Sequence, residues 1–245
     1  MKYLFGNWKM YLDYNESINL SKQLAEVNLP SKNKIVVFPS NLAFKAVQEN
    51  LASTQIATGP QNVAWVPKGG YTGEVSAHMF KDLGATYALI GHSERRHVFG
   101  ETDDEVRKKV EACLDAGLIP VVCIGETKEE LSEGKREYRL KKQIMKVFEN
   151  LDLSGKEIIV AYEPVWAIGT GTPCLPADAD DIHGWVKNEL KQYTNQEIPV
   201  LYGASVNAEN VLSFLSLSTI DGILAGGASV KFNDWQEIVK KAEEI

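Results

Sequence analysis

Residues 158 to 172 read I-I-V-A-Y-E-P-V-W-A-I-G-T-G-T. The first half is a short, β-branched apolar run, which favours a buried strand, and Pro164 is expected to end that strand. One carboxylate, Glu163, stands at the strand end among aromatic and apolar neighbours, where a poorly solvated carboxylate suits a general base. The glycine-rich segment Ala167 to Gly171 suits a mobile loop whose backbone amides can approach an anion. An ordinary strand followed by a turn would explain the same residues, so this stretch alone leaves both interpretations open.

Short apolar runs of this kind alternate with amphipathic segments along all 245 residues. Eight such units give about thirty residues each, enough for a strand, a helix and two loops. Because the strands lack polar alternation and no linker or repeat divides the chain, we expect a single (β/α)8 barrel domain over residues 1–245. The runs lie at Tyr3–Trp8, Ile35–Phe38, Ile56–Thr58, Tyr87–Ile90, Ile119–Ile124, from Ile158, and at Val200–Tyr202 and Gly222–Ala225.

A doubly wound open sheet is the alternative architecture. It would place a G-x-G-x-x-G turn after the first strand, where this sequence has Gly6-Asn7-Trp8-Lys9. The barrel is therefore the better prediction.

The amphipathic segments carry helix signals. Asp13 with Glu16 can cap the first helix, Thr102 with Glu105 and Thr127 with Glu130 form capping boxes, and Gly117 is expected to end a helix. The residues predicted to face the core are Leu20, Leu24, Val27, Val106, Val110, Cys113, Leu114, Leu140, Ile144, Val147, Phe148, Leu151, Trp235, Ile238, Val239, Ala242 and Ile245.

Composition narrows the functional class. The hydrophobic fraction of 44% and charged fraction of 24% are ordinary for a globular protein, and the net charge of −7 disfavours nucleic acid and anionic membrane as partners. No apolar run approaches a membrane span or a signal sequence, so a cytoplasmic location is expected. The three cysteines, Cys113, Cys123 and Cys174, indicate reduced, buried thiols rather than disulfides or a zinc site.

Polar and glycine residues follow several of the predicted strands, at the barrel end where active sites lie. A base, a histidine and a cation on one rim favour proton transfer next to a carbonyl, which needs an electrophile and a fixed positive field for the enediolate. Backbone amides in the last two loops could bind a phosphate. The strand-end residues are Asn7, Lys9, His92, Ser93, Glu94 and Glu163, with Tyr202-Gly203-Ala204-Ser205 and Ala225-Gly226-Gly227-Ala228-Ser229 in the two loops.

Five separated motifs resemble those of one enzyme family, in its order and over nearly the whole chain. They are G-N-W-K-M at Gly6, I-G-H-S-E-R-R at Ile90, A-Y-E-P-V-W-A-I-G-T-G at Ala161, Y-G-A-S-V at Tyr202 and G-G-A-S at Gly226. The sequence is similar to the triosephosphate isomerases. The resemblance implies interconversion of dihydroxyacetone phosphate and glyceraldehyde 3-phosphate in glycolysis and gluconeogenesis, without metal or cofactor.

The resemblance also implies residue roles. Glu163 matches the base, and His92 the neutral acid that polarises the carbonyl. Lys9 and Asn7 match the groups that stabilise the enediolate. The matching phosphate ligands are the amides of Gly169, Ser205, Gly226 and Gly227, and the supporting residues are Glu94, Ser93 and Thr72.

Three residues depart from the family pattern. Tyr11 stands where an Asn usually follows the first motif, Ala204 replaces the second Gly of Y-G-G-S, and Thr172-Pro173-Cys174 replaces the usual Lys-x-Ala. Pro173 is expected to stiffen the C-terminal hinge of the loop after Glu163, or simply to begin the next helix.

Two other functions compete with this interpretation. A sugar-phosphate aldolase or epimerase would need a Schiff-base lysine or a metal set, but Lys9 is the only lysine placed on the rim and the four histidines lack ligand spacing. A non-catalytic barrel would be expected to lack the base, the histidine or the lysine, and all three are present.

The segment Gln61 to Glu74 is long for a loop between a strand and a helix. It carries Trp65, Val66 and Tyr71, apolar side chains that a monomer would leave in water. We therefore expect a homodimer joined by this loop, and the resemblance implies that Thr72 reaches the neighbour's site near Asn7 and Lys9.

Overall fold

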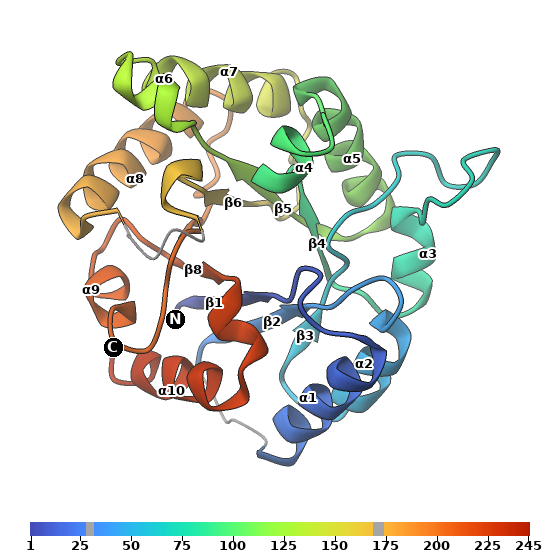
Figure 1. Ribbon diagram of the computed structural model, residues 1–245. Coiled ribbons are helices and arrows are strands. Elements are labelled where there is room, and N and C mark those ends of the chain that lie inside the picture. Colours follow the sequence, from blue (N-terminus) through green and yellow to red (C-terminus); the bar gives the residue numbers. More distant parts are fainter. Residues whose placement is uncertain (28–31, 169–173) are drawn as a thin grey trace.

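A parallel eight-stranded sheet forms the centre of the molecule in a computed structural model that describes residues 1–27, 32–168 and 174–245 (Figure 1). The strand order is β3-β2-β1-β8-β7-β6-β5-β4. Two backbone hydrogen bonds join the ends of the sheet, from Thr86 N to Thr58 O (3.1 Å) and from Leu89 N to Pro60 O (2.9 Å). The strands are β1 Tyr3–Asn7, β2 Lys34–Phe38, β3 Ala57–Thr58, β4 Tyr87–Ile90, β5 Ile119–Ile124, β6 Ile159–Tyr162, β7 Val200–Tyr202 and β8 Gly222–Ala225.

Helices surround this barrel on the outside, as Figure 1 shows. The (β/α)8 fold is therefore confirmed, with strand bounds within one residue of those predicted for the described chain. The helices are α1 Tyr14–Val27, α2 Phe44–Leu51, α3 Ala77–Asp82, α4 Ser93–His97, α5 Asp103–Ala116, α6 Lys128–Ser132, α7 Arg136–Phe148, α8 Pro176–Leu190, α9 Val211–Leu215 and α10 Phe232–Ala242, with 3-10 turns η1 Val165–Ala167 and η2 Gly227–Val230.

Two apolar layers explain why the strands read as continuous apolar runs. In β5, Val121 and Cys123 belong to a cluster inside the barrel, while Val122 and Ile124 pack outward against the helices. Each strand must therefore be apolar on both faces. The interior cluster comprises Phe5, Val36, Phe38, Tyr87, Leu89, Val121, Cys123, Ile159, Ala161, Leu201 and Leu224.

Most helix signals predicted from the sequence are confirmed. Both threonine capping boxes are present, the Asp13 and Glu16 side chains each accept the other's backbone N–H at 2.8 Å, and Gly117 ends α5 with φ 72°. The predicted core is wrong at two positions. Val27 is 38% exposed as the last residue of α1, and Ile245 is 45% exposed because α10 ends at Ala242.

The segment after β5 contains a break that the apolar periodicity did not reveal. It forms two helices, α6 and α7, separated at Gly134, whose φ of 68° an L-residue rarely adopts. Leu151 lies beyond the end of α7 but still packs against the outer apolar layer.

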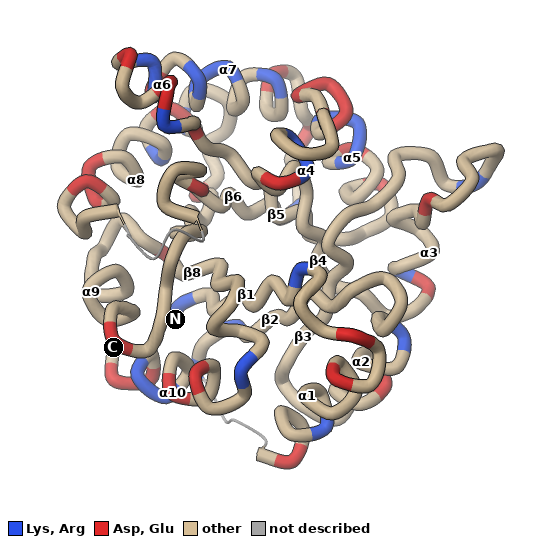
Figure 2. The backbone as a smooth tube through the Cα atoms, viewed as in Figure 1, with Lys and Arg blue, Asp and Glu red and all other residues tan. Residues whose placement is uncertain are grey.

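Charged residues lie mainly on the outer helices and loops, with both signs interspersed (Figure 2). All three cysteines are free and buried, as predicted. Within the described residues, no helix combines the length and the apolar character needed to span a bilayer.

Candidate active site

A cavity of about 470 Å³ lies at the C-terminal ends of the strands. The barrel brings there residues that are far apart in the sequence, because every parallel strand ends on the same rim. Seven of the predicted site residues line it: Asn7, Lys9, His92, Glu163, Ser205, Gly226 and Gly227. Gly169 lies outside the described residues.

Glu163 directly follows β6, and its carboxylate is almost fully buried. The Ser93 N–H donates to Oε2 at 2.8 Å, while Oε1 lies 3.3 Å from His92 Nε2. A Cβ on Gly203 would come within 2.9 Å of Glu163 Cγ, so the neighbouring loop must be glycine at that position for the side chain to lie as it does. One oxygen is thus anchored, and the other is left facing the histidine.

His92 caps the start of α4 and is 6% exposed. The Glu94 N–H donates to Nδ1 at 3.2 Å, so that nitrogen acts as an acceptor and carries no proton. The ring is therefore neutral and carries its proton on Nε2, the nitrogen nearer to Glu163. In this state it can donate a hydrogen bond to an oxygen in the cavity.

Lys9 adopts φ 49°, a left-handed conformation that is uncommon for a lysine. Several contacts hold it there. Its N–H donates to Asn7 Oδ1 at 3.0 Å, and its carbonyl accepts from Gln61 Nε2 at 2.8 Å. The ammonium group pairs with Glu94 Oε1 at 2.6 Å, and its chain passes so close to Gly226 that a Cβ there would lie 3.2 Å from Lys9 Cε. A positive charge is thereby fixed at the cavity rim.

The loops after β7 and β8 bring backbone amides to the opposite side of the cavity. Gly226 and Gly227 begin η2, and Ser205 Oγ donates to the Ala167 carbonyl at 2.8 Å. Ala204 does not adopt positive φ, so its replacement of the usual glycine introduces no strain of that kind. No three or more His, Cys, Asp or Glu side chains in the described chain are arranged to hold a metal ion.

Comparisons with known proteins agree with this geometry. The family model described as triosephosphate isomerase matches residues 2–242. The chain belongs to the triosephosphate isomerase family. Proteins of that name from Dictyoglomus thermophilum and Francisella philomiragia are 40% identical over 245 residues and 41% identical over 249, each alignment covering at least 98% of both chains. One from Acidithiobacillus ferrooxidans is 38% identical over 97% of this chain and 95% of its own.

The two residues after β4 that were predicted to support the site both contact other predicted site residues. Ser93 supplies the N–H that binds Glu163, and Glu94 contacts both His92 and Lys9. Thr72 is different: it is exposed on the Gln61 to Glu74 loop and does not line the cavity of its own chain.

A second buried carboxylate that was not predicted from the sequence lies near Glu163. Glu126 is fully buried, and its Oε1 accepts hydrogen bonds from Tyr162 OH at 3.0 Å and Trp166 Nε1 at 2.8 Å. Burial raises the pKa of Glu126, although these hydrogen bonds partly oppose the shift. Glu126 follows β5 as Glu163 follows β6, so the strand-end rule could have found it.

Tyr202 and Cys123 were likewise not assigned a place in the site. Tyr202 OH accepts the Cys174 N–H at 3.1 Å, which ties the start of the segment before α8 to β7. Burial, with Glu163 nearby as a second cause, raises the pKa of Cys123 well above its usual value. The thiol is therefore an uncharged neighbour of Glu163.

Proposed function

We propose that Glu163 is the base with which this isomerase interconverts dihydroxyacetone phosphate and glyceraldehyde 3-phosphate. The observation that carries the proposal is the pairing of one buried carboxylate with one neutral histidine: Glu163 Oε1 lies 3.3 Å from His92 Nε2 at the cavity wall. From the cavity, a substrate carbon would approach Glu163 Oε1 while its neighbouring carbonyl oxygen approaches His92 Nε2.

The reaction then follows from the groups on the rim. Glu163 removes a proton from the carbon next to the carbonyl, and the electron pair moves to form an enediolate whose charge rests on oxygen. His92 Nε2–H donates to that oxygen, and the Lys9 ammonium and the Asn7 side chain supply a fixed field for the negative charge. His92 donates its Nε2 proton to the enediolate oxygen and takes up the hydroxyl proton of the neighbouring oxygen, which becomes the new carbonyl oxygen. Glu163 returns its proton to the other carbon, so the isomerisation is complete and both residues regain their starting protonation.

The phosphate group would bind at the other end of the cavity. The proposal is supported by Ser205, Gly226 and Gly227, which line the cavity and whose backbone amides could bind an anion even in a protein whose net charge is −7. Gly169, proposed as a further donor, lies in the part of the chain that the structure does not describe.

The experiment that tests the base is Glu163→Gln, which keeps the shape of the side chain but removes its basicity. We expect kcat to fall by at least about 10²-fold, the usual contribution of a general base, with little change in the affinity for a phosphate analogue. Glu209→Gln, an exposed carboxylate at the edge of the same cavity, is the matched control. A loss of kcat below about tenfold in Glu163→Gln, roughly 1.4 kcal/mol, would show that Glu163 is not the base.

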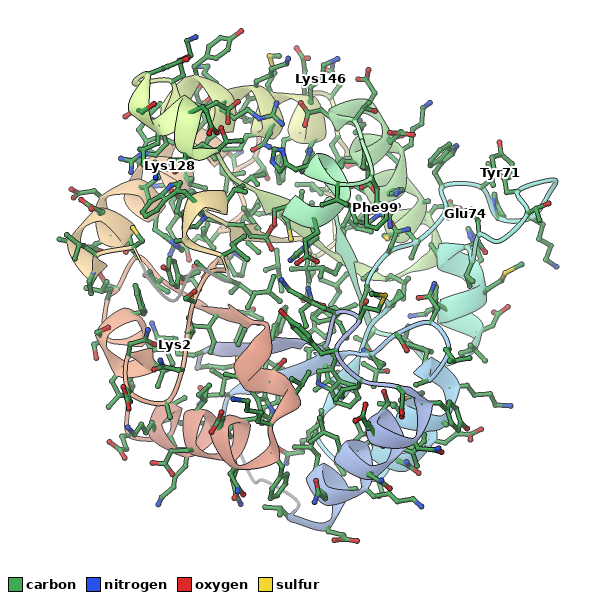
Figure 3. All side chains as sticks on the ribbon, in the orientation of Figure 1. Lys2, Tyr71, Glu74, Phe99, Lys128 and Lys146 are labelled. Atoms are coloured by element: carbon green, nitrogen blue, oxygen red, sulfur yellow. The ribbon has the colours of Figure 1, made fainter. Side chains whose placement is uncertain are left out.

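We further propose a homodimer joined by the Gln61 to Glu74 loop. This loop projects from the barrel, with Tyr71 and Glu74 on its outer part and Phe99 on the neighbouring surface (Figure 3). The side chains of Met10 and Phe99 are 94% and 69% exposed, and Met10 directly follows Lys9. A second copy that covers this apolar surface would bring Thr72 toward the neighbour's Lys9.

Light scattering tests the dimer. A mass near 27.2 kDa at working concentration, together with full activity, would exclude it. We also propose that residues 1–245 form one domain, supported by the continuous outer apolar layer, and that this glycolytic enzyme is cytoplasmic.

A further inference from the structure

Gln143 interrupts the apolar face of α7. It is fully buried between Leu140 and Ile144 in the helical stripe that packs on the barrel. Its Oε1 accepts the Gly125 N–H at 2.9 Å, whereas its Nε2 is buried without a hydrogen-bond partner in the described part of the chain. A leucine or methionine would fill this space without the unpaired Nε2 but would leave the Gly125 N–H without its acceptor, so the acceptor oxygen is the feature that distinguishes glutamine here.

The bonded glycine belongs to a two-residue segment, Gly125 and Glu126, that we call the strap. It follows β5 and lies against the chain that leaves β6. The carbonyl of Ile124, just before the strap, accepts the Glu163 N–H at 2.7 Å, and the Glu126 carbonyl accepts the Val165 N–H at 3.1 Å. One hydrogen bond just before Gly125 and one just after it therefore hold the strap against the backbone of residues 163–165.

Gly125 of the strap packs directly against the Glu163 backbone, with no space for a side chain at position 125. A Cβ on Gly125 would lie 1.8 Å from the Glu163 carbonyl oxygen, far inside van der Waals contact. Any displacement of Gly125 toward β6 must therefore move the backbone of Glu163 as well. On its other side, Gly125 is held by the Gln143 amide.

We propose that Gln143 is a positioning residue for the isomerase reaction, which it serves by fixing Glu163 through Gly125. The inference rests on the proposed role of Glu163 as the base. Gln143 lies on α7, outside β5 and β6, and does not line the cavity (Figure 1). It acts only through the strap, which sets the distance from the Glu163 carboxylate to His92 and to the substrate carbon.

The test is Gln143→Met, which keeps the length of the side chain but removes the acceptor. Since a misplacement of about 1 Å at a reacting group can cost about 10²-fold in rate, we expect kcat to fall by about 10- to 100-fold. KM should change by less than about twofold, because the phosphate amides come from the loops after β7 and β8 and not from the strap.

Two control variants separate this effect from lost stability. Leu140→Ala removes a buried side chain one turn earlier on the same face of α7 and should lower the melting temperature while leaving kcat within about twofold. Gln143→Glu keeps an oxygen opposite the Gly125 N–H and should lose less kcat than Gln143→Met. An equal loss in the Glu and Met variants, or in Leu140→Ala, would overturn the proposal.

A readout that does not depend on which residue is the base is the backbone amide resonance of Glu163 in a ¹⁵N spectrum. The proposal requires that this resonance shift in Gln143→Met and not in Leu140→Ala, because the Glu163 N–H bonds to the carbonyl next to Gly125. A shift without loss of kcat, or a loss of kcat without a shift, contradicts it. Should Gln143→Met not fold, Gln143→Ala, whose smaller side chain lets water reach the Gly125 N–H, is measured in the same way.

The two proposals can also fail separately. If Glu163→Gln retains its rate while Gln143→Met shifts the Glu163 resonance, the base assignment is wrong and the strap contact stands. If Glu163→Gln is inactive and Gln143→Met is unaffected in both readouts, the base assignment stands and Gln143 has no positioning role.

Discussion

Glu126 and Glu163 lie just beyond the ends of the neighbouring strands β5 and β6, yet their surroundings differ. Both carboxylates are buried. Glu126 accepts hydrogen bonds on one oxygen from two side chains, Tyr162 and Trp166. Glu163 is bonded by one backbone N–H, from Ser93, and its other oxygen faces His92 and the cavity. The environment, and not the residue type, separates a structural carboxylate from a reactive one.

The difference also explains how the two roles depend on each other. Glu126 accepts a hydrogen bond from Trp166, which lies three residues after Glu163. The backbone of Glu126 also belongs to the strap, which contacts Glu163 through Gly125. A base must take up and release a proton in each turnover, so it cannot be enclosed by donors on every side. In the proposed mechanism, Glu163 is the reactive carboxylate, while the hydrogen bonds of Glu126 hold the neighbouring Tyr162 and Trp166 side chains.

The largest effect on stability is expected for Glu126→Leu. It leaves the buried Tyr162 hydroxyl without its acceptor, which should lower the free energy of unfolding by about 2–3 kcal/mol. Glu126→Gln keeps an oxygen for both donors and should cost less than about 1 kcal/mol. Denaturant unfolding of the two variants measures the difference. Equal losses of stability in the two variants would mean that the hydrogen bonds to Glu126 contribute little to folding, which would contradict a structural role for this carboxylate.

The positions of these residues explain which features of the fold and the site could be predicted from the sequence. The barrel was predictable because each strand must be apolar on both faces, and Glu163, His92 and Lys9 were predictable because polar residues at strand ends converge. Glu126 satisfies the same rule but was overlooked, since the two side chains that donate to it come from β6 and η1. Gln143 could not have been found, because nothing in a helical stripe indicates that one polar member bonds to a distant glycine.

The loop after Glu163 is only partly covered by the described residues. The predictions that concern Gly169 and the Pro173 hinge fall within residues 169–173, which lie outside the described residues. The flanking contacts are described: Trp166 bonds to Glu126, and the Cys174 N–H bonds to Tyr202. The stiffening of the hinge by Pro173 stays a prediction.

The next effect in size concerns the reactive carboxylate and is expected for Gly203→Ala. Gly203 has ordinary φ, so the added methyl acts only by contact, 2.9 Å from Glu163 Cγ and 3.2 Å from the Tyr162 carbonyl. Displacement of Glu163 should lower kcat by about 10-fold or more, equivalent to at least about 1.4 kcal/mol. Gly184→Ala, where the nearest atom would be 3.9 Å away, is the steric control. Unchanged kinetics in Gly203→Ala would show that the reactive carboxylate tolerates displacement and is less constrained than the distances imply.

The smallest effect concerns His183, which packs edge to face on Tyr162 at 5.6 Å and so belongs to the structural side of the comparison. Burial, with the positive charge of Lys187 as a second cause, lowers the pKa of His183 to about 3. Above pH 6.5 the side chain is neutral in both the folded and the unfolded chain. Below that value the unfolded chain binds a proton at this side chain and the folded protein does not, so stability falls as the pH decreases from about 6.5 toward 3.

Glu126 should act in the opposite direction. Its pKa is raised by burial, so the folded protein binds that proton more readily, and stability rises as the pH falls through the folded-state pKa toward about 4.5. The two contributions can be separated by unfolding measurements between pH 6.5 and 5 on the parent, His183→Phe and Glu126→Gln. We expect the acid-side loss of stability to become shallower in His183→Phe and steeper in Glu126→Gln, while His97 and the surface carboxylates cancel in each difference. Parallel curves of stability against pH for the parent and His183→Phe would contradict this prediction. They would show that His183 binds protons equally in the folded and unfolded chains and does not contribute to the pH dependence of stability.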